Sequence, residues 1–186
     1  MLDAAIRRAG RHKAENAPGW ATKLLEAFRR EDVRNLVFLP DTVMGRLLAL
    51  AETDPFFRLT AVHREEEAVG VVTGLFLGGQ RAAMLIQNTG LGNSLNALAS
   101  LAMAYKIPFP LVISLRGELG EFNPAQLVMG RGVRGCLDAL GIQHFTLSRE
   151  DEVDAIADGV LKTCFTAQEP VAILLSAQMT GWKDEQ

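Results

Sequence analysis

Short apolar runs alternate along the chain with longer stretches in which apolar residues recur at helical spacing. The apolar runs predict six buried strands, at residues 35–39, 59–62, 82–87, 111–115, 143–146 and 171–176. The stretches between and beside them predict helices at 21–28, 43–50, 66–77, 95–105, 128–140 and 148–166. Strands alternating with amphipathic helices are typical of a parallel sheet covered on both faces. We therefore expect a three-layer α/β/α fold with a six-stranded, mainly parallel sheet.

The beginning of the chain differs in character from the rest. Residues 1–17 read as a polar helical extension that ends at Pro18-Gly19, so we place one domain at 18–186. The first 19 residues are basic but have no continuous apolar core, unlike a signal peptide. No apolar run approaches the roughly 20 residues that a membrane helix needs. We expect a cytoplasmic protein.

Composition narrows the choice of partners. The 186 residues are 48% hydrophobic and 22% charged, with a net charge of −3. Without an excess of basic residues, nucleic acids and anionic membranes are poor candidates as partners. Cys136 and Cys164 fall in predicted helices, where we expect them to be buried, reduced thiols.

Four segments fall where a parallel sheet binds ligands, outside the carboxyl ends of its strands. They are residues 40–42, 63–67, 87–93 and the polar loop 116–124. Asp41 or Thr42 is placed to cap the helix that follows the first strand. Residues 88–93 read as a glycine-containing loop, with Asn93 or Ser94 as the cap of the next helix.

Three consecutive glutamates, Glu65 to Glu67, join the second strand to its helix. The ordinary interpretation is a solvated helix start, which suits the positive end of the helix dipole. However, residues 68–74 are apolar nearly all round and rich in small side chains, which predicts a buried helix with close packing on its glycines. Burial disfavours the charged form of a carboxyl group at the mouth of such a helix. A protonated glutamate there would be able to share its proton with a ligand nitrogen.

The glycines after the third strand suggest a nucleotide site only weakly. Gly90 and Gly92 match the beginning of a dinucleotide-binding fingerprint, but its third small position is Leu95. The chain has no Walker sequence, no nucleophile elbow and no metal-ligand spacing, and its three histidines are scattered. A dinucleotide-binding enzyme is therefore disfavoured.

Several segments together resemble the pyrimidine-binding domain of thiamine-diphosphate-dependent decarboxylases. The resembling segments are Leu39-Pro40-Asp41-Thr42, residues 64–70 (Arg-Glu-Glu-Glu-Ala-Val-Gly), residues 84–98, 105–108, 116–117, 124–126 with 129–130, and 137–141. The likeness is strongest to sulfopyruvate decarboxylase alpha subunits and to the amino-terminal half of phosphonopyruvate decarboxylases. It runs from about residue 20 to about residue 176, and the stretch Gln-Asn-Thr-Gly-Leu-Gly-Asn is its most specific part. Thr89 stands where serine is usual and keeps the hydroxyl.

The resemblance implies a catalytic glutamate. In this family one glutamate hydrogen-bonds N1′ of the aminopyrimidine and so activates the cofactor, which attacks a 2-oxo acid and releases carbon dioxide. The family has a small residue three positions after that glutamate and a glycine nine positions after it. Ala68 and Gly74 fit Glu65 on both counts. Glu66 and Glu67 are then expected to face solvent or a subunit interface.

The resemblance also implies positions for the other site residues. The residues expected near the pyrimidine are Gln87, Asn88, Thr89, Gly90, Leu91, Gly92 and Asn93, besides Glu65. The residues expected near the substrate are Asp41 and Thr42 at the active-site entrance and Gln126. Arg116 and Arg131 are candidates to balance an anionic substrate, or are simply surface arginines.

The family's diphosphate site is missing from this sequence. That site consists of Gly-Asp-Gly followed by Asn-Asn, and the nearest fragment here is Asp158-Gly159 in a predicted helix. The resemblance therefore implies a separate beta-type subunit that holds the diphosphate of thiamine diphosphate and its Mg²⁺, with no metal ligand on this chain. We expect an alpha-beta hetero-oligomer, or a homo-oligomer of the isolated chain, acting on a small anionic 2-oxo acid such as sulfopyruvate or phosphonopyruvate. Carboligation in place of simple decarboxylation stays open, as does a non-catalytic structural or regulatory subunit.

Overall fold

All six predicted strands form, and they pair in one sheet. The computed structural model describes residues 19–181, so the helical extension expected at 1–17 lies outside the described residues. The strands are β1 (Val33–Phe38), β2 (Arg58–Ala61), β3 (Arg81–Gln87), β4 (Pro110–Ser114), β5 (His144–Leu147) and β6 (Val171–Leu175). Their order is β2-β1-β3-β4-β6-β5, and every neighbouring pair is parallel. The predicted parallel sheet is confirmed.

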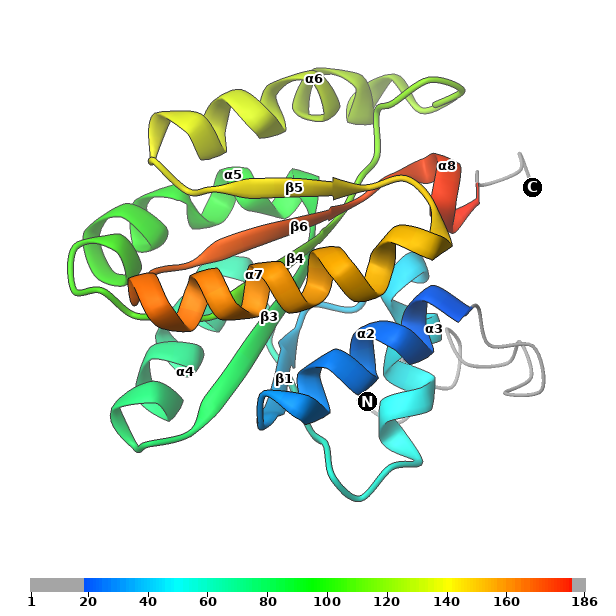
Figure 1. Cartoon of the computed structure of the whole chain (residues 1–186). Helices are drawn as coiled ribbons and strands as arrows, with labels where there is room; N and C mark the ends of the chain where they lie inside the picture. Colours follow the sequence, from blue (N-terminus) through cyan, green and yellow to red (C-terminus); the bar gives the residue numbers. More distant parts are fainter. Residues whose placement is uncertain (1–18, 182–186) are drawn as a thin grey trace.

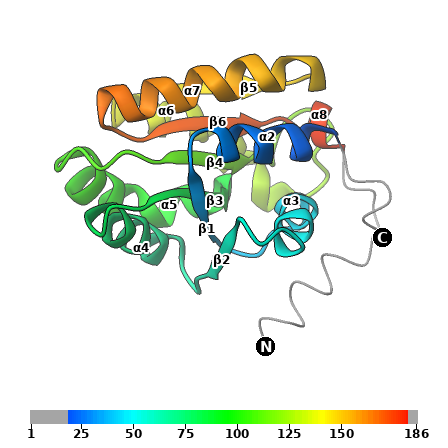
Figure 2. The same cartoon turned by 60° about the horizontal axis from the view of Figure 1, so that its bottom comes forward.

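Helices cover both faces of this sheet, which gives the predicted three layers (Figure 1, Figure 2). One face is covered by α2 (Gly19–Arg30), α3 (Thr42–Glu52) and α7 (Val153–Ala167), and the other by α4 (Glu65–Leu77), α5 (Asn88–Ala97) and α6 (Pro124–Ala139). Successive residues of a strand point to opposite faces. In β1, Leu36 and Phe38 pack in the first apolar layer and Val37 in the second. Because both layers are apolar, the strands read as continuous apolar runs in the sequence.

Side chains cap the beginnings of α3 and α6. Asp41 caps α3, since its Oδ2 accepts hydrogen bonds from the backbone N–H of Val43 at 3.1 Å and of Met44 at 3.4 Å. Asn123 caps α6, which begins at Pro124 rather than at the predicted residue 128. Proline suits the first helical position, where its missing N–H has no intrahelical partner.

The predicted loop at residues 88–93 is wrong. Helix α5 begins at Asn88, directly after β3, and neither Gly90 nor Gly92 has a positive φ. Asn93 and Ser94 therefore lie inside the helix and do not cap it. The Ser94 hydroxyl donates to the backbone carbonyls of Gly90 and Leu91 instead. After Ala97 the helix continues as a π-helical segment, η2 (Leu98–Met103).

Smaller differences concern the ends and the exposure of other helices. Helix α7 begins after a short 3₁₀ turn at Glu150–Glu152, not at residue 148. The prediction that residues 68–74 are buried on all sides is wrong for this single chain, because Gly70 and Gly74 are exposed. The two cysteines are free thiols, as predicted, but only Cys164 is buried, and Cys136 is partly exposed. Burial raises the pKa of the Cys164 thiol to about 12. Among residues 19–181, no helix is both long and apolar enough to cross a membrane.

Candidate active site

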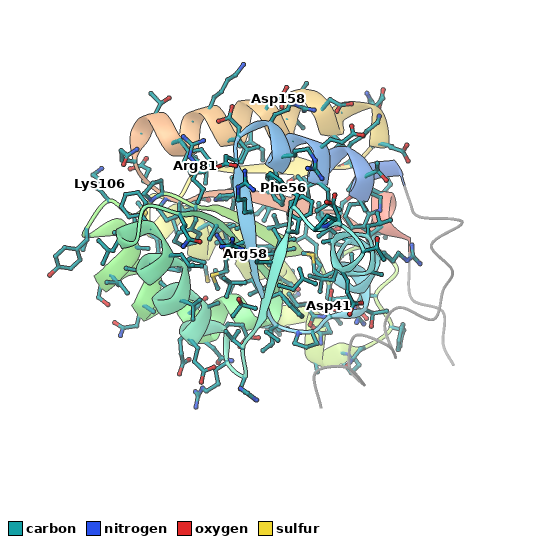
Figure 3. All side chains as sticks on the ribbon, turned by 90° about the horizontal axis from the view of Figure 1, so that it is seen from below. Asp41, Phe56, Arg58, Arg81, Lys106 and Asp158 are labelled. Atoms are coloured by element: carbon teal, nitrogen blue, oxygen red, sulfur yellow. The ribbon has the colours of Figure 1, made fainter. Side chains whose placement is uncertain are left out.

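The carboxyl ends of neighbouring parallel strands bring the predicted segments to one edge of the sheet. Asp41 follows β1, Glu65 begins the helix after β2, Gln87 ends β3 and Arg116 follows β4. Figure 3 labels Asp41 near one end of the strands and Arg81, the first residue of β3, toward the other. The four segments expected to meet at this edge do meet there.

The three consecutive glutamates occupy three different environments. Glu67 caps its own helix, since its Oε2 accepts from the backbone N–H of His63 at 3.0 Å and of Arg64 at 3.4 Å. Glu66 forms an exposed ion pair with Arg64 at 2.9 Å. Only Glu65 is turned inward, and it is 8% exposed. The structure therefore separates Glu65 from its neighbours by position and by surroundings.

Helix α5 forms the seat of the Glu65 side chain. A Cβ atom built on Gly90 would overlap Cγ, Cδ and Oε1 of Glu65, so the glutamate lies against the bare backbone of that glycine. Asn93, one turn further along α5, donates from Nδ2 to Glu65 Oε2 at 3.3 Å. Within residues 19–181 this is the one hydrogen bond that the carboxylate accepts. Oε1 therefore has acceptor capacity left for a ligand.

A second carboxylate, that of Asp41, ties three strand ends together. Its Oδ1 accepts from Gln87 Nε2 at 2.9 Å, and its Oδ2 accepts from Ser114 Oγ at 2.9 Å. Gln87 in turn accepts through Oε1 from the hydroxyl of Thr89 at 2.7 Å. These contacts connect the ends of β1, β3 and β4 with the first turn of α5.

Asn88 fixes the beginning of α5 to the loop after β4. Its side chain is fully buried and makes two hydrogen bonds with the backbone of Arg116. Nδ2 donates to the carbonyl at 2.9 Å and Oδ1 accepts from the N–H at 3.0 Å. Leu91 is also fully buried, in the apolar layer beneath α5, whereas Gly92 faces α6, where Met129 is its nearest neighbour.

The guanidinium of Arg116 is committed to a carboxylate of its own loop. Its Nε and one terminal nitrogen donate to the two oxygens of Glu121, each at 2.6 Å, and both side chains are largely buried. Glu121 also accepts from the backbone N–H of Gly117 and of Asn123. The Arg116 hydrogen bonds lower the pKa of Glu121 to about 2, and Glu121 in turn raises the pKa of Arg116. The positive charge of Arg116 is thus neutralised within the loop.

A pocket opens beside this loop. It lies between residues 115–122, the first turn of α3 at Val43, and the short helix α8 (Ala177–Thr180). Glu118 closes one side, since its Oε2 accepts from the backbone N–H of Ala177 at 3.0 Å. The same carboxylate pairs with Arg134 at 3.5 Å. The pocket is narrow and has room for about one water molecule.

The remaining predicted substrate residues lie at the carboxyl edge or on α6. Thr42 is exposed at the start of α3, next to the pocket. Gln126 lies in the first turn of α6, and its buried Oε1 accepts no hydrogen bond within residues 19–181. Arg131 is exposed on the same helix. The structure brings Glu65 into direct contact with Gly90 and Asn93.

Sequence reasoning missed three residues of the site: Ser114, Glu118 and Glu121. Ser114 had a readable signal, because it is the polar last residue of an otherwise apolar strand. The two glutamates lie in a polar loop whose course has no sequence pattern. Within residues 19–181, no group of three or more His, Cys, Asp or Glu side chains is placed to hold a metal ion.

Comparison with known proteins identifies the family. No protein-family model matches the chain. The sulfopyruvate decarboxylase subunit alpha of Methanocaldococcus jannaschii is 34% identical over 154 residues, which are 83% of this chain and 91% of that protein. The corresponding subunit of Methanococcus maripaludis is 44% identical over 116 residues, 62% of this chain and 70% of that protein.

Longer proteins match as well. A sulfopyruvate decarboxylase of Methanosarcina acetivorans is 34% identical over 158 residues, which are 84% of this chain but 40% of that protein. Phosphonopyruvate decarboxylases of Streptomyces also match, over a smaller part of their length. The chain belongs to the family of sulfopyruvate decarboxylase alpha subunits, and it is a carboxy-lyase subunit.

Proposed function

We propose that this chain binds the aminopyrimidine of thiamine diphosphate through Glu65, as the alpha subunit of a 2-oxo acid decarboxylase. The observation that carries the proposal is the seat of Glu65. Of three consecutive glutamates, Glu65 alone is turned inward, against Gly90. Its Oε2 is held by Asn93, and its Oε1 is left for a ligand.

The residues present fit the pyrimidine end of the cofactor. A carboxyl group that is nearly buried is well placed to hold a proton at a ring nitrogen, because water does not compete for it. Asn93 fixes which oxygen of Glu65 is free to do so. When bound, thiamine diphosphate supplies the electron sink that accepts the electron pair left by departing carbon dioxide. The part of this chain is to orient the ring and to hold the proton at N1′.

The outer surface of α4 and α5 has the character of a subunit interface. Residues 68–80 and 82–105 contain no charged side chain, although both helices lie on the outside of the described chain. Gly70 and Gly74 have no neighbour within 4 Å of a Cβ position, and Leu77 is 74% exposed. Depletion of charge together with exposed apolar side chains is typical of the core of a subunit interface.

We propose that a beta-type subunit covers this surface and supplies the diphosphate site with its Mg²⁺. The name of the relatives, subunit alpha, implies a second subunit in those enzymes. Glu65 lies at the first turn of α4, at one end of the same surface. A cofactor held by the partner would reach Glu65 across such an interface. The assembled enzyme is then an alpha-beta hetero-oligomer.

The proposed substrate is a small anionic 2-oxo acid, sulfopyruvate or phosphonopyruvate. Thr42 and Gln126 are the polar side chains of this chain that we place near it, and Arg131 is an exposed cation on the same helix as Gln126. The Gln126 amide, whose buried Oε1 accepts no hydrogen bond within residues 19–181, can offer its NH₂ group as a donor to an anionic substrate.

The test begins with the partner. A tagged form of this chain is purified from its native cells, and a co-purifying chain is identified by mass spectrometry. The complex is then supplied with thiamine diphosphate, Mg²⁺ and sulfopyruvate or phosphonopyruvate, and carbon dioxide release is measured. Glu65→Gln should assemble normally but lose at least about 100-fold in turnover, because proton transfer at N1′ is lost. Glu66→Gln is the matched control and should keep its turnover.

Two results would contradict the proposal. Purification of this chain alone, as a homo-oligomer, would favour a structural or regulatory subunit. Near-normal turnover of the Glu65→Gln complex would remove Glu65 from the chemistry even if the complex forms.

A further inference from the structure

We infer that Asp41 is a positioning residue for Glu65 rather than a substrate contact. The inference rests on the proposed function of Glu65, but its structural part concerns only how α5 is held. Asp41 does not touch Glu65. It acts through Gln87 and the first turn of α5, the helix that seats the glutamate.

The Asp41 carboxylate is already engaged by four donors of this chain. Two backbone N–H groups of α3 and the hydroxyl of Ser114 donate to Oδ2, and Gln87 donates to Oδ1. Oδ2 accepts three of these hydrogen bonds and Oδ1 accepts one, so only Oδ1 keeps an acceptor position. A carboxylate held in place by four donors of its own chain is suited to positioning those donors.

The connection continues from Gln87 into α5. The Gln87 amide donates to Asp41 and accepts from Thr89, so its orientation is fixed from both sides. Thr89 is the second residue of α5, and Gly90 follows it. Since Glu65 lies directly against Gly90, a shift or rotation of this first turn would displace the Glu65 carboxylate. Asp41 therefore fixes the position and rotation of the first turn of α5, against which Glu65 packs.

The pattern of donors and acceptors allows a reciprocal exchange. In Gln87→Glu, two carboxylates face each other and the donor to Asp41 is lost, so the beginning of α5 should loosen. Combining Gln87→Glu with Asp41→Asn returns a donor to the contact, now from residue 41 to residue 87. In the double variant the hydroxyl of Thr89 still has an acceptor on residue 87, and the hydroxyl of Ser114 still has one on residue 41. One change should thus repair the other.

The first measurement uses the isolated full-length chain and needs no cofactor. Hydrogen–deuterium exchange of peptides that cover α5 should be about 10-fold faster in Gln87→Glu, since a hydrogen bond to a charged group is lost. The double variant should return to within about 3-fold of the natural chain. Ser114→Ala is the matched control: it removes another donor to Asp41 and should leave exchange in α5 unchanged. Unchanged α5 exchange in Gln87→Glu, or no recovery in the double variant, would overturn the inference.

The second measurement uses the assembled enzyme. Gln87→Glu should lower kcat far more than it raises KM for the 2-oxo acid, and the double variant should recover most of kcat. A double variant that recovers exchange in α5 but stays inactive, with KM for the 2-oxo acid strongly raised, would make Asp41 a substrate contact and overturn the inference. If the natural complex itself shows no turnover, the proposed function fails, while the exchange experiment still decides whether Asp41 holds α5.

Discussion

Glu65 and Gly90 are in such close contact that no side chain fits between them. The glutamate begins α4, the glycine lies in the first turn of α5, and a Cβ atom at position 90 would overlap three atoms of the carboxyl group and its stem. Gly90 therefore serves the packing of two helices and not the turning of the chain. Its φ is not positive, so no left-handed backbone requires a glycine there.

Gly90→Ala should inactivate the assembled enzyme without unfolding it. Alanine favours a helix by about 1 kcal/mol over glycine, but its methyl group forces Glu65 out of its seat. A displacement of about 1 Å is enough to lower turnover about 100-fold. Gly159→Ala, on the exposed side of α7, is the control, because nothing lies within 4 Å of a Cβ there. Equal activity of the two variants, measured by carbon dioxide release, would contradict the proposed seat.

Glu67 should matter for stability and not for catalysis. Glu67→Ala removes the side chain that accepts from the N–H groups of His63 and Arg64 and should cost about 1 kcal/mol in the free energy of unfolding. Glu66→Ala removes an exposed ion pair and should cost at most about 0.5 kcal/mol. Urea denaturation of the isolated chain measures both. A loss of turnover per assembled complex in Glu67→Ala would be inconsistent with this division of roles.

The ion pair of Arg116 and Glu121 should make stability depend on pH in a defined range. The pKa of Glu121 falls from 4.5 to about 2 on folding. A carboxyl group with a lowered pKa stabilises the folded state fully above its unfolded pKa, and this contribution disappears as pH falls toward the folded pKa. Glu121→Gln should therefore lower the free energy of unfolding by about 3 kcal/mol at pH 6 to 7, which is the energy that corresponds to this shift in pKa. The difference from the natural chain should shrink between about pH 4.5 and pH 2.

Denaturant titrations at several pH values check this prediction. A stability difference between the two proteins that stays constant down to pH 2 would show that Glu121 is not held in its ionised form by Arg116.

A charge on the outer surface of α4 should block assembly while the fold persists. Nothing lies within 4 Å of a Cβ at Gly74, so Gly74→Arg should fold with unchanged or slightly higher thermal stability. In the complex the new charge would be buried without a partner, which is strongly unfavourable. Thr166→Arg, on the exposed side of α7, is the control and should still bind the beta-type subunit. Normal co-purification of Gly74→Arg would place the interface elsewhere.

The sheet was predictable because both of its faces are covered. Burial on two sides makes each of the inner strands β1, β3, β4 and β6 a largely apolar run, whereas the edge strands β2 and β5 are only partly buried. All six appear in the sequence within two residues of their observed ends. Helix α5 was less predictable because glycine is ambiguous in sequence. At Gly90 and Gly92 it permits close packing within a helix, but the same residues are also typical of loops.

The candidate site was predictable only in part. The choice of Glu65 among three glutamates came from a family resemblance, and the structure gives the physical distinction: one glutamate caps, one pairs with Arg64 and one turns inward. The partnership of Arg116 with Glu121 depends on the course of the loop between them. The course of a loop leaves no periodic pattern in the sequence. Arg116 therefore looks free to bind a substrate in the sequence, although in the fold it is paired with Glu121.

The engaged arginines have a consequence for selectivity. Around the pocket, Arg116 is neutralised by Glu121 and Arg134 is shared with Glu118, so those two guanidinium groups exert little net attraction on an incoming anion. We expect the free subunit to attract 2-oxo acids with a sulfonate or phosphonate group no better than 2-oxo acids with an uncharged side chain. Preference for a doubly charged substrate would then arise only on assembly with the partner subunit.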